Sequence, residues 1–335
     1  RMKNVLLTGG FGYIGSHTAS ILAEEKIRFF VLDNFANCKF SVIKRLEEIT
    51  NETIFFEEGD IRDTKRLEEI IINHEISSVI HFAALKSVED SLINPLEYYE
   101  VNIHGTISLL KAMEKTGIRE LLFSSSATVY GVPNYLPIDE KHLTNALNPY
   151  GNSKLMVEKM LLDLTTSDNS WSVTTLRYFN PVGAHPSKLI GDDPTSLKSK
   201  NLMPKIIDVI RGDSDEIKIF GKDYSTFDGT GIRDYIHIMD LAKAHIKALR
   251  FLQKSKGYHT FNIGTGKGSS VLELIDTFEE VTGLKVPKRF ENRRDGDVSE
   301  CYADPSKANN ILGWRSEYDL KEMCLSSWEF SKLNY

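Results

Sequence analysis

The chain has 335 residues, 41% of them hydrophobic, and a formal net charge of −6. That length exceeds what one compact core usually holds, so it favours one large domain with a smaller partner. The acidic balance argues against nucleic acid as the main partner, because binding a phosphate backbone needs a basic surface, and no apolar run approaches the roughly 18 residues that span a bilayer.

The first half of the chain alternates strand-like apolar runs with amphipathic helical stretches. Strands separated by helices form βαβ units, whose strands run parallel and are covered on both faces. The pattern therefore predicts an α/β fold, a Rossmann-type doubly wound parallel sheet. Strands are predicted at residues 3–8, 29–32, 54–56, 79–82, 120–124 and 173–176, and helices at 14–25, 67–73, 96–116 and from Pro149 onward.

After about Asn180 this regular alternation loosens. Prolines and glycines crowd residues 181–194, which predicts a loop over the site. The remaining residues mix short strands and helices, as a smaller C-terminal α/β domain would. A helix near 240–251 is expected to return to the large domain. We therefore expect one domain over 1–180, with a returning segment near 238–265, and a second mainly over 181–335.

The cysteines bear on the compartment and on metals. Cys38, Cys301 and Cys324 are odd in number and widely spaced, which fits neither a disulfide framework nor a zinc site. The start of the chain leads straight into a strand and shows no signal-peptide pattern. These observations predict a reducing, cytoplasmic setting and no metal.

A glycine-rich turn follows the first predicted strand and opens the first predicted helix. Gly9, Gly12 and Gly15 form GxxGxxG, which permits a tight turn, close approach of the backbone to a pyrophosphate and close helix–strand packing. The helix N-terminus then directs free N–H groups at the phosphates. Asp33 ends the second strand, where a carboxylate accepts hydrogen bonds from a ribose diol and repels a 2′-phosphate. The pattern favours NAD over NADP.

A second glycine-rich stretch spans residues 264–270. It resembles a phosphate-binding loop, but the four residues required between the first Gly and Gly-Lys-Ser/Thr are missing. We interpret this stretch as a turn before a helix.

Catalytic chemistry is predicted at the helix that begins near Pro149. Tyr150 and Lys154 are four residues apart and share one helical face. A phenol has a pKa of about 10, which a nearby ammonium and the positive nicotinamide of bound NAD can lower. Tyr150 could then take a proton from a hydroxyl while hydride leaves the same carbon. Ser126, at the end of a predicted strand, would hydrogen-bond the reacting oxygen.

In addition, segments along nearly the whole chain resemble the UDP-hexose 4-epimerases of the extended short-chain dehydrogenase/reductase family. The shared segments include TGGFGYIGSHT at 8–18, HFAALKSVEDS at 81–91, FSSSATVYG at 123–131, LRYFNPVGAHPS at 176–187 and DGTGIRDYIHIMDLA at 228–242. This resemblance implies a homodimer that binds NAD mainly in the first domain and a UDP-hexose mainly in the second. It also implies roles for particular residues.

Three groups of residues are implied by the resemblance. The catalytic residues are Tyr150, Lys154 and Ser126. The cofactor residues are Gly9, Gly12, Tyr13, Ile14, Gly15, Asp33, Asn34, Phe35, Ala36, Asn37, Cys38, Asp60, Ile61, Phe82, Ala83, Ala84, Leu85, Lys86, Asn102, Tyr150, Lys154 and Phe179. The substrate residues are Lys86, Ser126, Tyr150, Asn180, Asn201, Leu202, Phe220, Arg233, Arg294, Asp297 and Cys301.

The reaction implied is the interconversion of UDP-glucose and UDP-galactose through a 4-keto sugar, with NAD tightly bound. A rotating intermediate requires UDP to be held firmly, and Arg233 and Arg294 can neutralise a diphosphate. Cys301 occupies the family position where a bulky Tyr restricts some members to these two sugars. A small residue there predicts that UDP-GlcNAc and UDP-GalNAc are also interconverted, although Cys301 could instead be a small buried residue in a pocket that other walls close.

Three alternatives remain. A nucleotide-sugar dehydratase or decarboxylase of the same fold typically needs Asp or Glu two residues after the catalytic serine, where this chain has Thr128. An ordinary dehydrogenase would release NADH. A non-catalytic NAD-binding protein would have no need of Tyr150, Lys154 and Ser126.

Overall fold

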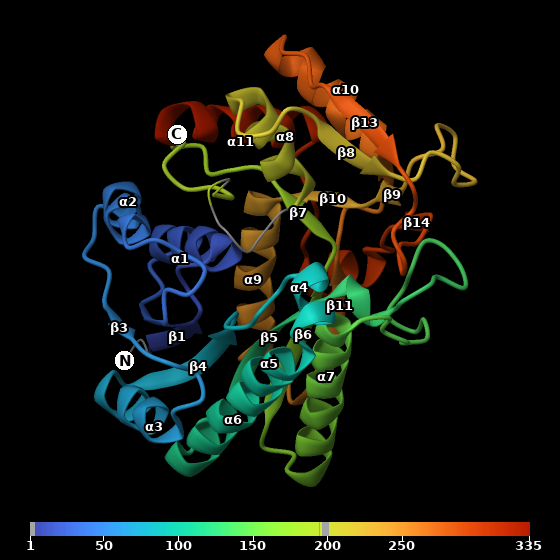
Figure 1. The fold of residues 1–335 in the computed structure, drawn as a ribbon. Helices are drawn as coiled ribbons and strands as arrows, with labels where there is room; N and C mark the ends of the chain where they lie inside the picture. The colour runs from blue at the N-terminus through green and yellow to red at the C-terminus, as the bar shows by residue number, and fades with distance from the viewer. Residues whose placement is uncertain (1–3, 194, 196–200) are drawn as a thin grey trace.

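A seven-stranded parallel sheet forms the centre of the computed structural model, which describes residues 4–193, 195 and 201–335. Its strand order is β11-β6-β5-β4-β1-β2-β3 (Figure 1). The order reverses between β1 and β4, as in doubly wound sheets. The strands are β1 (Asn4–Thr8), β2 (Phe29–Asp33), β3 (Phe56–Glu58), β4 (Ile76–His81), β5 (Glu120–Ser126), β6 (Ser172–Tyr178) and β11 (Gly257–Ile263).

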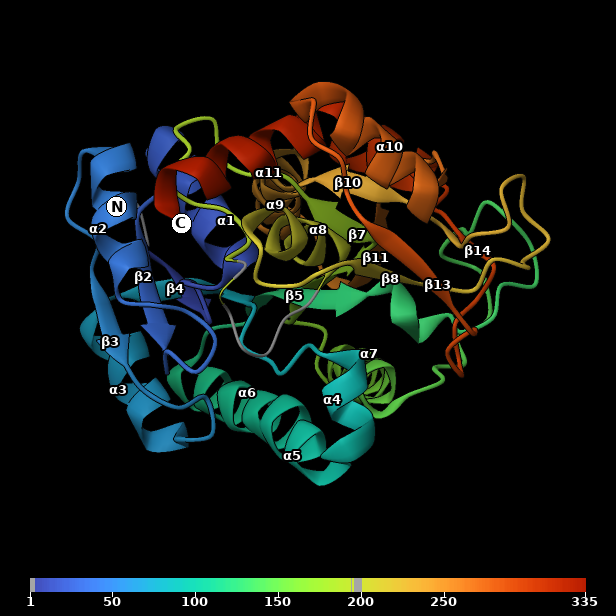
Figure 2. The same ribbon diagram turned by 45° about the horizontal axis from the view of Figure 1, so that its top comes forward.

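Helices cover both faces of this sheet, which is why strands such as β6 are buried throughout. Figure 2 shows α1 and α9 on one side and α6 and α7 on the other, and each side has its own apolar cluster. One layer contains α1 (Tyr13–Glu24), α2 (Ser41–Thr50) and α9 (Ile238–Leu252). The other contains α3 (Thr64–Asn73), α6 (Gly105–Thr116) and α7 (Pro149–Ser167), with α4 (Val88–Ile93), α5 (Pro95–Tyr99), a π-helical turn (Glu100–His104) and a 3-10 turn (Ala127–Val129) before α7.

A smaller α/β layer gathers at the top of Figure 1 around a third apolar cluster. Its short strands form three small sheets: β7 (Asn180–Val182) with β10 (Tyr235–His237); β8 (Ile217–Phe220) with β13 (Lys288–Glu291); and β9 (Ile232–Arg233) between β12 (Ser269–Ser270) and β14 (Glu300–Cys301). Its helices are α8 (Leu202–Arg211), α10 (Val271–Thr282) and α11 (Leu320–Asn334), and a π-helical turn spans Ala308–Leu312.

The predicted fold class is confirmed, and most predicted elements lie within a few residues of the observed ones. The predicted third strand at 54–56 is shifted, because Ile54 packs into the core while residues 56–58 pair with β2. The predicted helix at 96–116 is interrupted at 100–104 by the π turn, and α2 and α4 were not predicted. Lys3 and Pro194, parts of the predicted first strand and loop, lie outside the described residues.

In the structure, α9 packs on α1, and β11 pairs with β6 at the edge of the large sheet. The division into domains at residue 180, with a returning segment near 238–265, stays a prediction. Within residues 4–193, 195 and 201–335, no helix combines the length and apolarity that crossing a bilayer requires.

Candidate active site

A large cavity opens where the strands of the central sheet end. Thr8 of β1, Asp33 of β2, Ser124 of β5 and Tyr178 of β6 line it, together with Phe82 just after β4. Its empty space, with the solvent-open mouth included, is about 1550 Å³. The carboxyl edge at the reversal point is where doubly wound sheets bind ligands, and the lining runs along this edge from β2 to β6, which suits an extended ligand.

The three glycines of the first turn serve different purposes. Gly9 has φ +66°, and a Cβ there would lie 2.8 Å from backbone atoms of Ala83. A Cβ on Gly15 would lie 2.7 Å from Gly10 Cα. At Gly12, by contrast, the nearest atom of the chain would be Gly9 O at 3.4 Å, and Gly12 faces the cavity. Packing within the chain therefore explains why residues 9 and 15 are glycine. At Gly12, the missing side chain instead allows a ligand such as a pyrophosphate to come close to the backbone.

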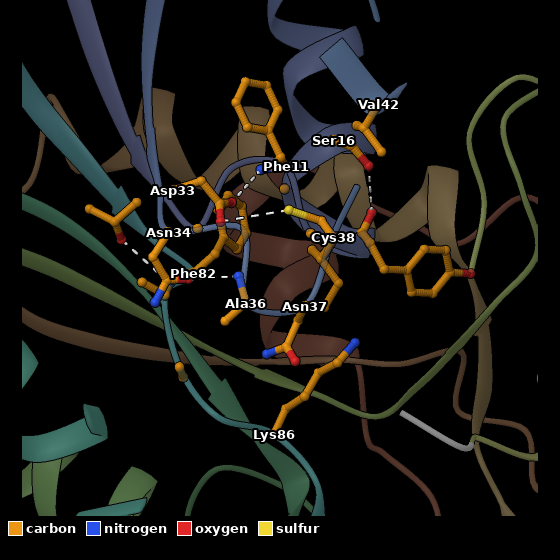
Figure 3. A pocket seen from close by; sticks show the side chains of 18 of the residues that line it. Phe11, Ser16, Asp33, Asn34, Ala36, Asn37, Cys38, Val42, Phe82 and Lys86 are labelled. Carbon is orange, nitrogen blue, oxygen red and sulfur yellow. Dashed lines mark hydrogen bonds between the residues drawn. The ribbon is translucent and has the colours of Figure 1, made fainter. Parts of the chain in front are cut away.

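Asp33 is fixed at the end of β2 and is only 7% exposed. Its carboxylate accepts hydrogen bonds from Phe11 N (3.0 Å) and Phe35 N (2.9 Å), and Cys38 Sγ lies 3.7 Å away (Figure 3). Burial raises the pKa of this carboxyl, and the two backbone N–H groups lower it. The carboxylate therefore has the rigid, cavity-lining position that recognition of a ribose diol requires.

Tyr150 and Lys154 line the cavity, and Ser126, which does not line it, is hydrogen-bonded to Tyr150. Pro149 begins α7, and Asn148 caps the helix by accepting from Gly151 N (2.8 Å). Lys154 is 4% exposed and donates from Nζ to Ser124 O (2.8 Å). A hydrogen bond with Ser126 lowers the pKa of Tyr150. The cap and the lysine contact thus place the phenol beside the end of β5.

Burial opposes the predicted lowering of the Tyr150 pKa. It is the largest effect on this phenol and raises its pKa, with Ser126 opposing it. Lys154 has its Nζ 6.0 Å from the Tyr150 ring centroid, and burial lowers its own pKa to about 7. Lys154 is therefore only partly charged near neutrality, and the joint lowering of the phenol pKa by Lys154 and the nicotinamide of bound NAD stays a prediction.

Asn102 supports the cavity without lining it. Its Oδ1 accepts from Leu85 N (2.8 Å), and its Nδ2 donates to Leu85 O (3.0 Å) and Ser153 Oγ (2.9 Å). The π turn at 100–104 carries this side chain. Asn102 therefore ties the cavity loop at 82–86 to the helix that bears Tyr150.

Nineteen of the 22 predicted cofactor residues line the cavity. The exceptions are Asn102, Phe35 and Phe179. Phe35 instead packs on Phe11, with ring centroids 5.5 Å apart, and Phe179 is buried in a separate apolar cluster. The nineteen are Gly9, Gly12, Tyr13, Ile14, Gly15, Asp33, Asn34, Ala36, Asn37, Cys38, Asp60, Ile61, Phe82, Ala83, Ala84, Leu85, Lys86, Tyr150 and Lys154.

Part of the predicted substrate set meets away from the cavity. Arg294 stacks over Phe220, 4.7 Å from the ring centroid, and pairs with Asp297 (2.9 Å) and Glu89 (2.9 Å). The charges of Arg294 and Arg233 both lower the pKa of Tyr224, which burial raises. The two arginines therefore act on one phenol, as a shared anion site requires, although carboxylates already hold Arg294.

The other predicted substrate residues are more dispersed. Asn201 donates to Asp192 (3.2 Å), which lines the cavity, and Asn180 is exposed at the start of β7. Cys301 is partly buried against the cluster that contains Phe179, whereas Leu202 packs on the core around α8. Leu202 thus has a plain packing environment.

The second glycine-rich stretch is a turn before α10, as predicted. Asp234 is fully buried and accepts from Thr265 N (2.8 Å), Gly266 N (3.0 Å) and Ala303 N (3.1 Å). A carboxylate of the chain thus uses the N–H groups of this turn.

Several cavity residues were not predicted. Lys39, Ser41, Val42 and Arg45 come from α2 and the loop before it, and the apolar spacing of Val42, Leu46 and Ile49 could have revealed that helix. Phe330 and Tyr335 reach the cavity from the far end of the chain, and no local pattern signals that approach.

Comparisons with known proteins agree with this geometry. Residues 6–326 match the family described as GDP-mannose 4,6 dehydratase. The chain is 49% identical to the UDP-glucose 4-epimerase of Bacillus subtilis (strain 168), covering 98% of this chain and 97% of that relative. The UDP-glucose-4-epimerase structure from Stenotrophomonas maltophila, with bound NAD and formylated UDP-arabinopyranose, is 47% identical, with a TM-score of 0.96 over 99% of this chain and 98% of that one.

A second solved structure, the UDP-glucose 4-epimerase from Bifidobacterium longum in complex with NAD+ and UDP, is 43% identical, with a TM-score of 0.95 over 99% of both chains. The chain therefore belongs to the UDP-glucose 4-epimerases, within the extended short-chain dehydrogenase/reductase family. The resemblance found in the sequence is confirmed.

The contrast between Gly12 and Gly15 gives a test of the cavity. We expect Gly12→Ala to fold normally and to bind NAD about tenfold more weakly or worse, because its methyl group would occupy only ligand space. Gly15→Ala should instead unfold at lower temperature, because its methyl group would meet Gly10. NAD content per chain and thermal unfolding measure the two effects. A Gly12→Ala protein with a full complement of NAD would contradict the assignment.

Proposed function

We propose that this member of the UDP-glucose 4-epimerase family interconverts UDP-glucose and UDP-galactose by inverting C4 of the hexose with tightly bound NAD. The observation that carries this proposal is that Tyr150 and Lys154 line the same cavity as the glycine turn and Asp33, with Ser126 hydrogen-bonded to Tyr150. When bound, NAD accepts a hydride from the sugar and later returns it.

In the proposed mechanism, Tyr150 is the general base and then the general acid. Its phenolate takes the proton of the 4-hydroxyl, and Ser126, already hydrogen-bonded to Tyr150, holds the same oxygen while the proton moves. A 4-keto sugar results and turns in the pocket, so that hydride would return to the opposite face of C4 while Tyr150 gives the proton back to the 4-oxygen. Lys154 supplies positive charge beside the phenolate.

For the hexose to turn, the UDP end of the substrate must be held firmly and the hexose end loosely. Arg233 and Arg294 would hold the diphosphate, whose charge would displace the Glu89 contact of Arg294. Phe220, which lies under Arg294, gives the uracil an apolar surface. No comparable set of charged groups is assigned to the hexose, which can therefore turn while UDP stays in place.

The chemistry of β5 disfavours the dehydratase alternative. Ser126 is followed by Ala127 and by Thr128, whose Oγ1 donates to Ser126 Oγ (2.9 Å). A hydroxyl at that position gives a hydrogen bond but lacks the acid or base that loss of water requires. The match to a family described as a dehydratase therefore indicates shared ancestry and fold rather than that reaction.

The central prediction concerns the phenol. Tyr150→Phe should lower kcat by ~10²–10⁴-fold, the usual contribution of a general acid–base group, and should retain NAD. Proton NMR of UDP-galactose with no NAD added follows conversion. Tyr135→Phe, which removes a surface phenol hydrogen-bonded to Asp139, is the matched control and should stay active. Full turnover by Tyr150→Phe would refute the mechanism, and a wild type that needs added NAD would indicate an ordinary dehydrogenase.

We further propose that the enzyme accepts UDP-GlcNAc and UDP-GalNAc. Cys301 lies on β14, in register with Arg233 of β9, and packs against the apolar cluster that contains Phe179 and Tyr130. A thiol at this position leaves more room than a phenol ring. The extra space would accommodate a 2-acetamido group as the sugar turns.

Enlarging Cys301 tests this specificity. Cys301→Tyr should reduce conversion of UDP-GalNAc by about tenfold or more and leave UDP-galactose conversion within a few-fold, because the ring would clash only with the larger sugar. Cys301→Ala, which keeps the space open, is the control. If wild type converts UDP-galactose alone, or Cys301→Tyr keeps both activities, the pocket is limited elsewhere.

We also propose a homodimer in the cytoplasm. Three neighbouring apolar side chains on α4 and α5, Leu92, Ile93 and Leu96, are 60%, 77% and 80% exposed, as a face covered by a second copy would be.

Light scattering should give twice the mass of one chain. Ile93→Lys with Leu96→Lys should halve it, whereas Ile72→Lys, at an exposed position on α3, should not. A wild-type mass of one chain would overturn the dimer.

A further inference from the structure

Next to Tyr150 and Lys154 lies a buried carboxylate that the proposed mechanism does not use. Glu158 is 4% exposed, and its Oε1 accepts from Ser125 Oγ (2.5 Å) and Arg177 Nε (3.0 Å). Its Oε2 accepts from Arg177 Nη2 (2.5 Å). Arg177 is 7% exposed and donates from Nη1 to Tyr130 Oη (2.9 Å). A charge pair this deeply buried persists only where its hydrogen bonds are complete.

The pair joins α7 to three neighbouring strands. Ser125 of β5, Arg177 of β6 and Asn262 of β11 stand opposite one another in the sheet register. Tyr130 Oη donates to Asn262 Oδ1 (2.6 Å), which closes the network across the sheet. Glu158 is the member that α7 contributes. Glu158 therefore adds a buried charged contact between this helix and the sheet.

Glu158 also continues the functional stripe of α7. Tyr150, Lys154 and Glu158 are spaced four residues apart, so they lie on one helical face. Each meets one residue of the serine run of β5: Tyr150 bonds Ser126, Lys154 bonds the carbonyl of Ser124, and Glu158 bonds the hydroxyl of Ser125. Moving Glu158 would therefore move the other two contacts.

We propose that Glu158, held by Arg177, is a positioning residue for the epimerisation: it sets the register of α7 on β5 and supplies a buried negative charge that acts on Lys154. This inference rests on the proposed function. It assigns a role in the reaction to a residue that reaches neither substrate nor cofactor.

The electrostatics support this role. Burial lowers the pKa of Lys154 to about 7, and the Glu158 carboxylate opposes that fall. The other groups facing the pair are neutral near pH 7: burial lowers the pKa of His81 on β4 to about 3, raises that of Tyr258 on β11 to about 12, and raises that of Tyr178 on β6. Glu140 and Lys307 also interact with Arg177, and their charges are of opposite sign. Glu158 is thus the negative charge acting on Lys154.

The test is the pH profile of kcat for Glu158→Gln with saturating UDP-galactose, which reports ionisations in the substrate complex. Removing the carboxylate takes away the negative charge that acts on Lys154, so the pKa of Lys154 falls further. We expect the alkaline limb, where Lys154 loses its proton, to move to lower pH by about one unit. The amide keeps the shape of the side chain and part of its hydrogen bonding.

Asp240→Asn is the matched control. Asp240 is a fully buried carboxylate on α9 that accepts from Glu317 N (2.9 Å) and Tyr318 N (3.0 Å), away from Lys154. It should lower the unfolding temperature and leave the alkaline limb in place. A Glu158→Gln protein that is less stable but has an unshifted alkaline limb would overturn the inference and leave the epimerase intact.

A second variant keeps the test available if Glu158→Gln does not fold. The double variant Glu158→Gln with Arg177→Gln removes both buried charges. The alkaline limb of its pH profile should still lie at lower pH than in wild type, because the carboxylate is the partner that acts on Lys154. An unshifted alkaline limb in the double variant would also overturn the inference. A wild type without turnover would remove the proposed function itself, and the inference with it.

Discussion

Parallel strands bring all their carboxyl ends to one edge of a sheet, and the rest of this structure depends on that constraint. Each strand must be followed by a helix that returns the chain to the other edge, so both faces are covered and the strands are largely buried. Side chains that can meet a ligand are then found toward the carboxyl ends of the strands. Asp33, Ser124 and Tyr178 mark such ends, and they line one cavity. The site is a consequence of the topology.

Local chemistry is what the sequence could predict. The glycines of the first turn, the carboxylate at 33 and the Tyr150–Lys154 spacing each act over a few residues, and their placement follows from one strand and one helix. Contacts between distant segments left no such signal. Phe35 turned from the cavity to Phe11, Leu202 entered a core, and Tyr335 reached the cavity from the end of the chain. Packing decided each of these outcomes, and packing depends on partners far away in sequence.

The backbone N–H groups of the two glycine-rich stretches have different uses, and a buried carboxylate decides which use each stretch has. At Gly12 the helix start has no side-chain cap, so its N–H groups face the cavity and remain for an anionic ligand. At residues 265 and 266 the turn N–H groups are taken by Asp234. In the second stretch a carboxylate takes two turn N–H groups, whereas in the first Asp33 takes Phe11 N and the helix start at Gly12 is left for a ligand. Glycine content alone could not distinguish them, because the deciding residue lies some thirty positions away.

The balance of charge around Tyr150 explains why the cofactor would have to remain bound. Burial raises the pKa of the phenol, and Lys154, with a pKa of about 7, is only partly charged near neutrality. The chain by itself therefore makes a poor base. Under the proposed function, the positive charge of the oxidised nicotinamide stabilises phenolate, and its loss on reduction lets the phenol keep its proton until hydride returns. Proton and hydride would then move together, and a 4-keto sugar released early would leave an enzyme with the wrong protonation state as well as the wrong redox state.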